Sequence, residues 1–443
     1  MSWIGKAAVA VERSPMLLCE LFEQALASLD REREIFSGFS AAKDVILKIS
    51  GDDFSSFQKS DRVPLPDPAK PTPGVLKNIG DIAAYFAACL RNGQGTDIPL
   101  DEPDVALPMT RHFKHQIAVG GTGTQTANCL ANCGFTHIFT HVPYLAPELE
   151  SLLHPAIRLY GNNAYYDRLY PERTTYAGVH YILDYAAGAK VTTTDGILSA
   201  PRPDRLILGG HPYNRRLRIA DEFIRLFDSP HPGSALIMAG FNAAREFEDF
   251  LAFVDDCSRL LDNYRRHTPD EMAFVHIEEC HHENQPAERR KVLAEKIWPK
   301  IDSIGMNEAE FATLGGFLGI EDDDVWRRLL EIAVRLGCNR ACLHTADRCF
   351  AVSRYAAHKE QKALGMGIIL ASARAHFGDF SALPAIRGML EKALPLSEKT
   401  RLPEPKTLED AYVGVEVPTL KGLPVVSSIG LGDAFTAGTT ACL

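Results

Sequence analysis

The sequence predicts an α/β protein with a doubly wound, mostly parallel sheet, helices on both faces of that sheet, and a small β-rich lid. Two observations support this prediction. From about residue 205 onward, short apolar runs alternate with helix-like stretches. In the first 200 residues this alternation is interrupted more often, and some segments are typical of antiparallel strands. Alternation of strands and helices is the pattern of a parallel sheet, and the broken part predicts a smaller β-rich unit interleaved with it.

The second half of the chain contains the apolar runs that predict the large sheet. Each run ends in a polar or Gly-bearing turn, and the runs are DRLILGG (204–210), SALIMAGF (234–241), EMAFVHIEE (271–279), IDSIGMNE (301–308) and NRACLHT (339–345). The stretch EDDDVWRRLLEIAVRLG (321–337) predicts a helix between the last two runs. In a doubly wound sheet, ligands bind beyond the carboxyl ends of the strands. The polar residues at those ends are therefore the expected site.

The lid is predicted from segments in the first half of the chain. Residues 61–74 (DRVPLPDPAKPTPG) form a Pro-rich connector, and 174–196 (TTYAGVHYILDYAAGAKVTTTDG) has the β-branched and aromatic content of strands joined by turns. We expect the large domain to comprise about 1–40, 70–110, 120–170 and 206–443. The lid is then expected from about 41–69, 111–119 and 171–205.

Charge and composition limit the possible partners. The chain has 443 residues and a formal net charge of −10. This charge argues against a nucleic acid or an anionic membrane that is bound through the overall electrostatic field of the protein. No run of apolar residues is long enough for a membrane span. Ten cysteines without paired spacing favour free thiols in a reducing compartment, so a cytoplasmic protein is expected. The sequence carries no signal for an oligomeric state.

The segment SSIGLGDAFTAG (427–438) carries the first candidate for chemistry. Gly430 and Gly432 allow a tight turn into a helix, and such a turn presents unpaired N–H groups to a phosphate. Asp433 lies in the first turn of that helix. An acid beside an anion suits a general base that takes a proton from an attacking hydroxyl. The alternative is an Asp that only caps the helix.

Two further strand ends carry acids. GMNEAEF places Asn307 and Glu310 three residues apart, on one face of a helix if one starts there. VHIEECHH ends another run with His276 and Glu278 on the same side of an extended chain. Acids at neighbouring strand ends can hold Mg²⁺ against nucleotide phosphates. Taken singly, each motif is more typical of a helix start or a solvated turn than of a metal site.

In this order, the motifs HIE (276–278), NEAE (307–310) and GLGD (430–433) resemble the HxE, NxxE and GxGD motifs of the ADP-dependent sugar kinases. These are the ADP-dependent glucokinases and phosphofructokinases of the ribokinase-like superfamily. Further segments resemble the family in the correct order: GFSAAKDVI (38–46), VGGTGTQTANCLA (119–131), HYILDY (180–185), PDRLIL (203–208) and AGFN (239–242). The HxE motif and the chain length favour this ADP-using branch over the shorter ATP-using one. The resemblance implies a ribokinase-like fold.

The resemblance also implies roles for individual residues. Asp433 would be the catalytic base, with Gly430 and Gly432 in the anion hole of the transferred phosphoryl group. Glu310 and Glu278 would position Mg²⁺. The expected nucleotide-binding residues are Arg205, Asn307, His344, Thr345 and Gly430. The expected residues around the sugar are Asp44, Asp97, Gly120, Gly121 and Asn242.

Two segments on the sugar side bear on the acceptor. Where the family has two amides before the acid, this chain has Ser40 to Lys43 before Asp44, which removes two hydrogen-bonding side chains. Asp97, in NGQGTDI (92–98), keeps an acid where the glucokinase branch has a glutamate and the phosphofructokinase branch a small residue. Asp97 favours an unphosphorylated sugar, whereas the altered segment indicates a rebuilt pocket.

The function expected from the resemblance is Mg²⁺-dependent transfer of the β-phosphoryl group of ADP to a sugar hydroxyl, giving AMP, most nearly as in the glucokinases. One alternative is phosphofructokinase activity or another ADP-dependent sugar or sugar-phosphate kinase. Another is an ATP-dependent ribokinase-type or nucleoside kinase. A sugar-binding relative without activity is the non-enzyme alternative.

Overall fold

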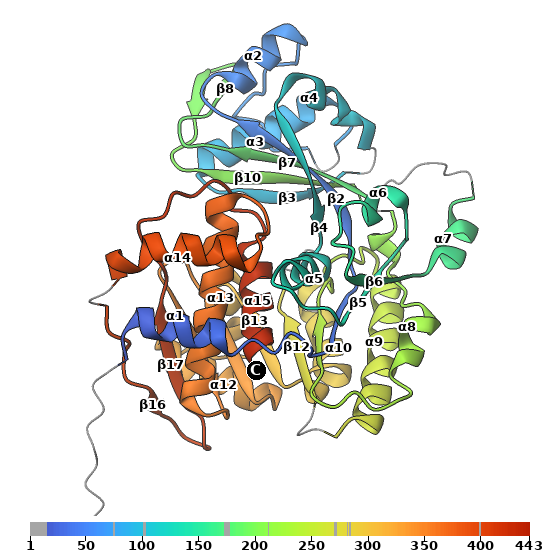
Figure 1. The fold of residues 1–443 in the computed structure, drawn as a ribbon. Coiled ribbons are helices and arrows are strands. Elements are labelled where there is room, and N and C mark those ends of the chain that lie inside the picture. The colour runs from blue at the N-terminus through green and yellow to red at the C-terminus, as the bar shows by residue number, and fades with distance from the viewer. Residues whose placement is uncertain are drawn as a thin grey trace, which may run out of the picture.

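The computed structural model describes residues 16–73, 76–100, 103–171, 178–210, 212–269, 273–280, 282, 285–397 and 400–443. These residues form a large sheet, a smaller sheet above it and a separate two-stranded hairpin (Figure 1). The two sheets correspond to the large α/β part and the β-rich part that the sequence predicts.

The large sheet has the strand order β16-β17-β15-β14-β13-β12-β11-β1-β5-β6. Its strands are β1 (Ile35–Gly38), β5 (Ile138–Val142), β6 (Ile157–Gly161), β11 (Ala235–Met238), β12 (Phe274–Glu278), β13 (Ser303–Met306), β14 (Arg340–His344), β15 (Arg348–Ser353), β16 (Lys406–Thr407) and β17 (Val413–Pro418). The pairs from β14 to β6 are parallel, and β15, β17 and β16 add an antiparallel edge. The apolar runs at 234–241, 271–279, 301–308 and 339–345 are therefore confirmed as neighbouring parallel strands.

Helices cover both faces of this sheet. One face packs against α1 (Leu18–Ala27), α5 (Thr122–Asn132), α13 (Ala357–Phe377), α14 (Leu383–Ser397) and α15 (Leu431–Cys442). The other packs against α8 (Asp221–Leu226), α9 (Phe247–His267), α10 (Pro286–Lys296), α11 (Glu308–Phe317) and α12 (Val325–Leu336). The short helices α6 (Pro147–Glu150) and α7 (Asn163–Leu169) flank the β6 edge. This two-sided cover makes the sheet doubly wound, as predicted.

The smaller sheet has the order β3-β10-β7-β2-β4. Its strands are β2 (Ala42–Ile49), β3 (Thr96–Pro99), β4 (His115–Gly120), β7 (Val179–Tyr185) and β10 (Asp204–Gly210). Its back face packs against α2 (Asp53–Ser60), α3 (Ile79–Asn92), α4 (Leu107–His112) and the hairpin of β8 (Lys190–Thr193) and β9 (Gly196–Ser199). The hairpin is antiparallel.

Two predicted boundaries of the lid are wrong. Residues 70–110 were expected in the large domain, but α3 buries its apolar face against the smaller sheet, and β3 pairs with β10 in that sheet. Residues 206–210 also belong to the smaller sheet, as part of β10. The physical reason is that the apolar side chains of α3 face the core of the smaller sheet. Residues 172–177 of the predicted strand segment lie outside the described residues.

The front face of the smaller sheet is turned toward the large domain. Ile46 of β2 and Ile182 of β7 pack with Ile429, which directly precedes the GLGD segment. Lys48 of β2 reaches the carbonyl oxygen of Val426 at 3.5 Å. Polar residues on this face therefore lie opposite the start of α15.

Helix α15 is held by its neighbours. Every residue from Ala434 to Ala441 is buried, and Gly438 lies so close to the backbone of Met366 and Gly367 in α13 that a Cβ atom would overlap it. A helix this short is marginal alone, so its packing between α13 and α5 stabilises it. Figure 1 shows α15 in the centre of the large domain.

Candidate active site

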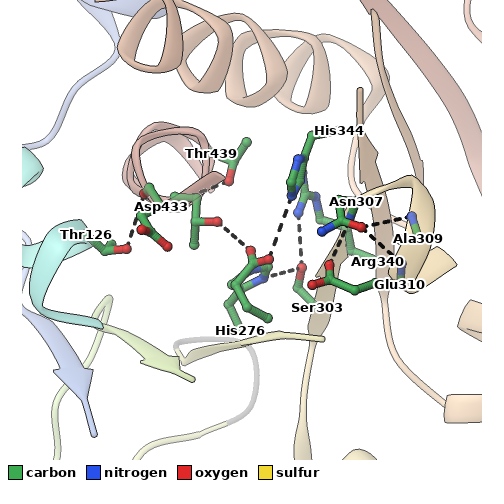
Figure 2. Close-up of polar contacts among 12 residues, drawn as sticks. Thr126, His276, Ser303, Asn307, Ala309, Glu310, Arg340, His344, Asp433 and Thr439 are labelled. Carbon is green, nitrogen blue, oxygen red and sulfur yellow. Dashed lines mark hydrogen bonds and ion pairs between the residues drawn. The ribbon is translucent and has the colours of Figure 1, made fainter. Parts of the chain in front are cut away.

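Two helix N-termini meet at the GLGD segment. Gly430 is the N-cap of α15 with φ of 72°, and a Cβ atom there would overlap the side chain of Gln125 in α5. Thr122, the first residue of α5, hydrogen-bonds the Asp433 carboxylate. Thr126 donates to the Asp433 carbonyl oxygen at 3.2 Å (Figure 2). Two sets of unpaired N–H groups and two helix dipoles favour an anion at this point.

The Asp433 carboxylate is a stronger base than an ordinary aspartate. Burial raises its pKa to about 6, the charges of Glu278 and Asp44 act in the same direction, and the hydrogen bond from Thr122 opposes them. The group is therefore ionised at neutral pH and can still accept a proton, as a general base requires. Asp433 is not the N-cap of α15, since that residue is Gly430, and the Asp433 carboxylate is instead hydrogen-bonded to Thr122 of α5.

Glu278, at the carboxyl end of β12, lies beside α15. His276 Nε2 lies 2.7 Å from Glu278 Oε1, and the hydroxyl of Thr436 in α15 donates to the same oxygen. His344 Nε2 lies 3.9 Å from Glu278 Oε2. Burial alone would raise the pKa of Glu278, but the hydrogen bond from His276 and the nearby His344 ring hold it well below its usual range. Glu278 is thus a fixed negative charge.

Asn307 and Glu310 form a reciprocal capping box at the start of α11. The Asn307 side chain accepts hydrogen bonds from the backbone N–H groups of Ala309 and Glu310, at 2.9 and 3.0 Å. Glu310 Oε2 accepts from the Asn307 N–H at 2.8 Å. The motif therefore has the structural role of a helix start. Glu310 Oε1 has no hydrogen bond to another described residue.

The electrostatics of Glu310 fit a nearby cation. Burial raises the pKa of Glu310 to about 7, the backbone N–H of Asn307 lowers it, and the charge of Glu278 raises it further. No group of three or more His, Cys, Asp or Glu side chains arranged to hold a metal is found in the described part of the chain. Mg²⁺ does not need one, because it binds through one or two carboxylates together with water and substrate phosphates. Glu278, whose charge raises the pKa of Glu310, gives together with Glu310 a pair of carboxylates that fits this donor set.

Three of the predicted sugar residues, Asp44, Asp97 and Gly120, lie on the front face of the smaller sheet. Asp44 of β2 and His180 of β7 are cross-strand neighbours, and His180 Nδ1 lies 2.7 Å from Asp44 Oδ1. Burial lowers the pKa of His180, but its hydrogen bond with Asp44 and the charge of Asp44 raise it above the usual value. Gly120 of β4 lies against the Asp44 carboxylate, where a Cβ atom would overlap it. Asp97 is exposed, close enough to Asp44 and His180 for their charges to act on it.

The predicted nucleotide-binding residues lie on different elements around the site. Arg205 of β10 lies near Asp97, so the predicted nucleotide and sugar residues share one face of the small sheet. His344 lies beside the GLGD segment, with its ring 5.2 Å from that of Phe435.

Three other predicted residues lie in turns. Asn242 is exposed in the turn after β11, and Gly121 caps α5 with φ of 96°. The hydroxyl of Thr345 donates to Arg348 O at 2.8 Å, within the turn between β14 and β15, so it has a structural role there.

Comparisons with known proteins decide the family. A sequence model described as "ADP-specific Phosphofructokinase/Glucokinase conserved region" matches residues 33–441. The chain belongs to this family of ADP-dependent sugar kinases. It is 24% identical to the ADP-specific phosphofructokinase of Pyrococcus abyssi (strain GE5 / Orsay), over 93% of this chain and 97% of that protein.

Solved structures share the fold of this ADP-dependent kinase. A hypothetical ADP-dependent phosphofructokinase from Pyrococcus horikoshii OT3 superposes with a TM-score of 0.69 at 18% identity, covering 94% of this chain and 98% of that one. An ADP-dependent kinase in complex with fructose-6-phosphate and ADPβS has a TM-score of 0.69 at 17% identity, covering 96% of each chain. The ribokinase-like fold is therefore confirmed. No helix among the described residues is long and apolar enough to cross a membrane.

Several residues of the candidate site were not predicted from the sequence. Arg374 of α13 is buried. Its Nε donates to the Ile429 carbonyl oxygen at 3.1 Å, and its Nη1 donates to the Gly378 carbonyl oxygen at 2.6 Å. The positive charge of Arg374 lowers the pKa of Asp433. Its signal was a lone arginine in the apolar helix ALGMGIILASARAHF (363–377). Thr122 and Thr436 had no signal beyond lying near a recognised motif.

A cavity of about 790 Å³ lies at the opposite edge of the large sheet, lined by Arg33, Phe274, Tyr355 and Leu443 among others. Phe274 begins β12 whereas Glu278 ends it, so this cavity is at the amino ends of the strands. Ligands of doubly wound sheets bind at the carboxyl ends. The candidate active site is therefore the GLGD segment and not this cavity.

The variant Glu310→Gln separates the capping role of Glu310 from its expected metal role. Glutamine can keep the capping box but carries no charge. We expect the Mg²⁺ concentration for half-maximal activity to rise by about tenfold or more, because one anionic partner of the metal is lost. A Mg²⁺ titration at saturating substrates measures this. Glu308→Gln, at an exposed position in the same helical turn, is the matched control. A titration of Glu310→Gln that coincides with that of the unmutated protein would contradict the metal role.

Proposed function

We propose that this protein transfers the β-phosphoryl group of ADP to a hydroxyl of fructose 6-phosphate and releases AMP. The observation that carries the proposal is Asp433, an ionised carboxylate with a pKa raised to about 6, placed where two helix N-termini favour an anion. A carboxylate there repels a phosphate in simple binding, but it accepts a proton effectively during phosphoryl transfer.

The proposed step uses the residues as follows. The acceptor hydroxyl gives its proton to Asp433 while its oxygen attacks the β-phosphorus. The bond from that phosphorus to the bridging oxygen breaks, and AMP leaves with the electron pair. The N–H groups at Gly430 to Asp433 would receive the negative charge of the transferred group. Bound Mg²⁺, held by Glu278 and Glu310 directly or through water, would neutralise charge on the phosphates.

The smaller sheet would supply the acceptor side. Asp44, hydrogen-bonded to His180, faces the start of α15 and is a fitting acceptor for a sugar hydroxyl. Arg205 has no hydrogen bond or ion pair from its guanidinium to another described residue and could reach a phosphate. Closure of this sheet over the reactants would exclude water, which otherwise competes as the phosphoryl acceptor.

The choice of acceptor rests on the relatives. The sequence alone favoured glucose, on the strength of Asp97. The relatives that match over nearly the whole chain are instead named ADP-specific phosphofructokinases, and they support the alternative better. Glucose stays the second candidate because the Asp97 carboxylate lies near Asp44 and His180.

One assay tests donor and acceptor together. AMP formation from Mg²⁺-ADP is measured with fructose 6-phosphate, glucose, ribose 1-phosphate and common nucleosides, with ATP run in parallel. We expect AMP with fructose 6-phosphate and at least tenfold less with glucose. The reverse preference would favour the second candidate. Turnover only with ATP would show that ADP is not the phosphoryl donor. Turnover with neither nucleotide would indicate a binding protein.

A further inference from the structure

A row of buried polar residues crosses the large sheet beneath α13 and α15. His276 of β12, Ser303 of β13 and Arg340 of β14 are in register: His276 pairs with Ser303, and Ser303 with Arg340. The three residues are at most 1% exposed. Glu360 of α13, also fully buried, accepts a hydrogen bond from Arg340 Nε at 2.8 Å. The row therefore begins at a helix and ends beside Glu278.

The hydrogen bonds of the row can run in one direction, from Arg340 to Glu278. Arg340 can only donate, and its Nη1 donates to Ser303 Oγ at 3.1 Å. Ser303 then uses its single proton toward His276 Nδ1 at 2.9 Å. Because Nδ1 accepts, the proton of the neutral ring is on Nε2, which donates to Glu278 Oε1 at 2.7 Å. Figure 2 shows His276, Ser303 and Arg340 side by side.

Stability alone does not account for this row. Apolar side chains in the place of a buried ion pair are often as stable or more stable. Arg340 Nη2 and Glu360 Oε2 also have no hydrogen-bond partner among the described residues, which reduces the stabilisation that the pair provides. A row that ends at Glu278 has an evident use, since it fixes which nitrogen of His276 carries the proton.

We propose that Arg340, Glu360 and Ser303 are positioning residues that fix the tautomer of His276 and thereby the orientation of the Glu278 carboxylate toward the metal–nucleotide complex. This inference rests on the proposed function. None of the three residues touches the reacting atoms. They act through His276, and Gly305 in β13 leaves the space that the Glu278 carboxylate fills, since a Cβ atom there would overlap it.

Ser303→Ala tests the proposal with little risk to folding, because it leaves the Arg340–Glu360 pair intact. The nitrogen chemical shifts of His276, in protein labelled with ¹⁵N-histidine, report the tautomer without any turnover. We expect a single Nε2–H tautomer in the unmutated protein and a mixture in the variant. Calorimetry is expected to show about tenfold weaker binding of Mg²⁺-ADP, as for other partners of metal-binding groups.

Three comparison variants make the result specific. Ser303→Thr keeps the hydroxyl and is expected to restore both readouts. Ser234→Ala removes a buried hydroxyl that bonds Tyr264, next to the amino end of β11, and is expected to change neither. Arg340→Lys keeps a charge for Glu360 but cannot reach Ser303 with a second donor, so it should act as Ser303→Ala does.

Each outcome decides the inference. An unchanged His276 tautomer in Ser303→Ala, or Mg²⁺-ADP affinity within twofold of the unmutated value, would overturn it and leave the row a structural feature. If no form of the protein binds Mg²⁺-ADP, the proposed function fails and the link to the nucleotide with it. The tautomer result would still decide whether the row fixes His276.

Discussion

Replacing Asp433 by asparagine is expected to lower turnover by about 10²–10⁴-fold, the range that a general base contributes. Asparagine keeps the shape and the hydrogen bond with Thr122 but cannot accept the proton of the attacking hydroxyl. Mg²⁺-ADP should bind at least as tightly as before, because a negative charge next to the phosphates is removed. The initial rate of AMP formation and calorimetric binding of the nucleotide measure the two effects. Unchanged turnover would show that Asp433 is not the base.

The pH dependence of the unmutated protein gives an independent test of the same assignment. Asp433 must be ionised to act, and its pKa is raised to about 6, chiefly by burial. The ratio kcat/KM, which reports the free enzyme, is expected to fall as pH drops through about 6. The residual activity of Asp433→Asn should lack this acid limb. An acid limb at the same pH in the variant would assign it to another group.

The stability of the variant shows whether its loss of activity comes from misfolding. The pKa of Asp433 is higher in the folded state than in the unfolded chain, so the folded state binds more protons between about pH 4 and pH 6. The free energy of unfolding of the unmutated protein therefore falls as pH rises through that window. Asp433→Asn avoids this loss and should be more stable above pH 6, by up to about 3 kcal/mol. Urea unfolding at pH 7.5 and pH 4 measures the difference, which should vanish at the lower pH.

The large sheet could be predicted from sequence because its central strands are buried on both faces. Such strands are short apolar runs, and each is followed by a helix, so the order of β11 to β14 follows from local pattern. The limits of the smaller domain could not be predicted in the same way. The amphipathic pattern of α3 shows that one of its faces is buried, but it does not show which sheet covers that face.

The candidate site was predictable to the extent that its residues follow strands or begin helices. Asp433, Glu310 and Glu278 lie at such positions, and the structure brings them into one electrostatic group. Arg374 and Thr436 could not be predicted, because they reach the site from within helices and only the packing of α13 and α15 places them there. The sequence of the NEAE motif could not decide between a helix start, which the structure confirms, and the proposed metal role, since a capping box and a metal carboxylate have the same sequence.

A buried ion pair next to Glu278 leads to the second large prediction. Arg290 of α10 donates from Nε and Nη2 to Glu279 Oε1, at 3.0 and 2.9 Å, and the side chains are 3% and 1% exposed. Burial raises the pKa of Glu279 to about 7, while Arg290 opposes this by favouring the charged form. Arg290→Met leaves that carboxylate buried without a partner. We expect the free energy of unfolding to fall by about 3–5 kcal/mol, as for other buried pairs that lose one member.

The double variant Arg290→Met, Glu279→Gln separates the contribution of the ion pair to stability from the contribution of packing. Removing both charges removes the unpaired carboxylate, so most of the lost stability should return. The single variant should also be less stable at pH 8 than at pH 6, because its Glu279 must be ionised in the unfolded chain at both pH values but resists ionisation when folded. Urea unfolding of both variants measures these differences. Arg327→Met removes an arginine that is 77% exposed in a pair with Asp322 and should change stability by less than about 1 kcal/mol. If Arg290→Met also lowered the free energy of unfolding by less than about 1 kcal/mol, Glu279 would not depend on Arg290. The end of β12 would then be held by backbone and apolar packing alone.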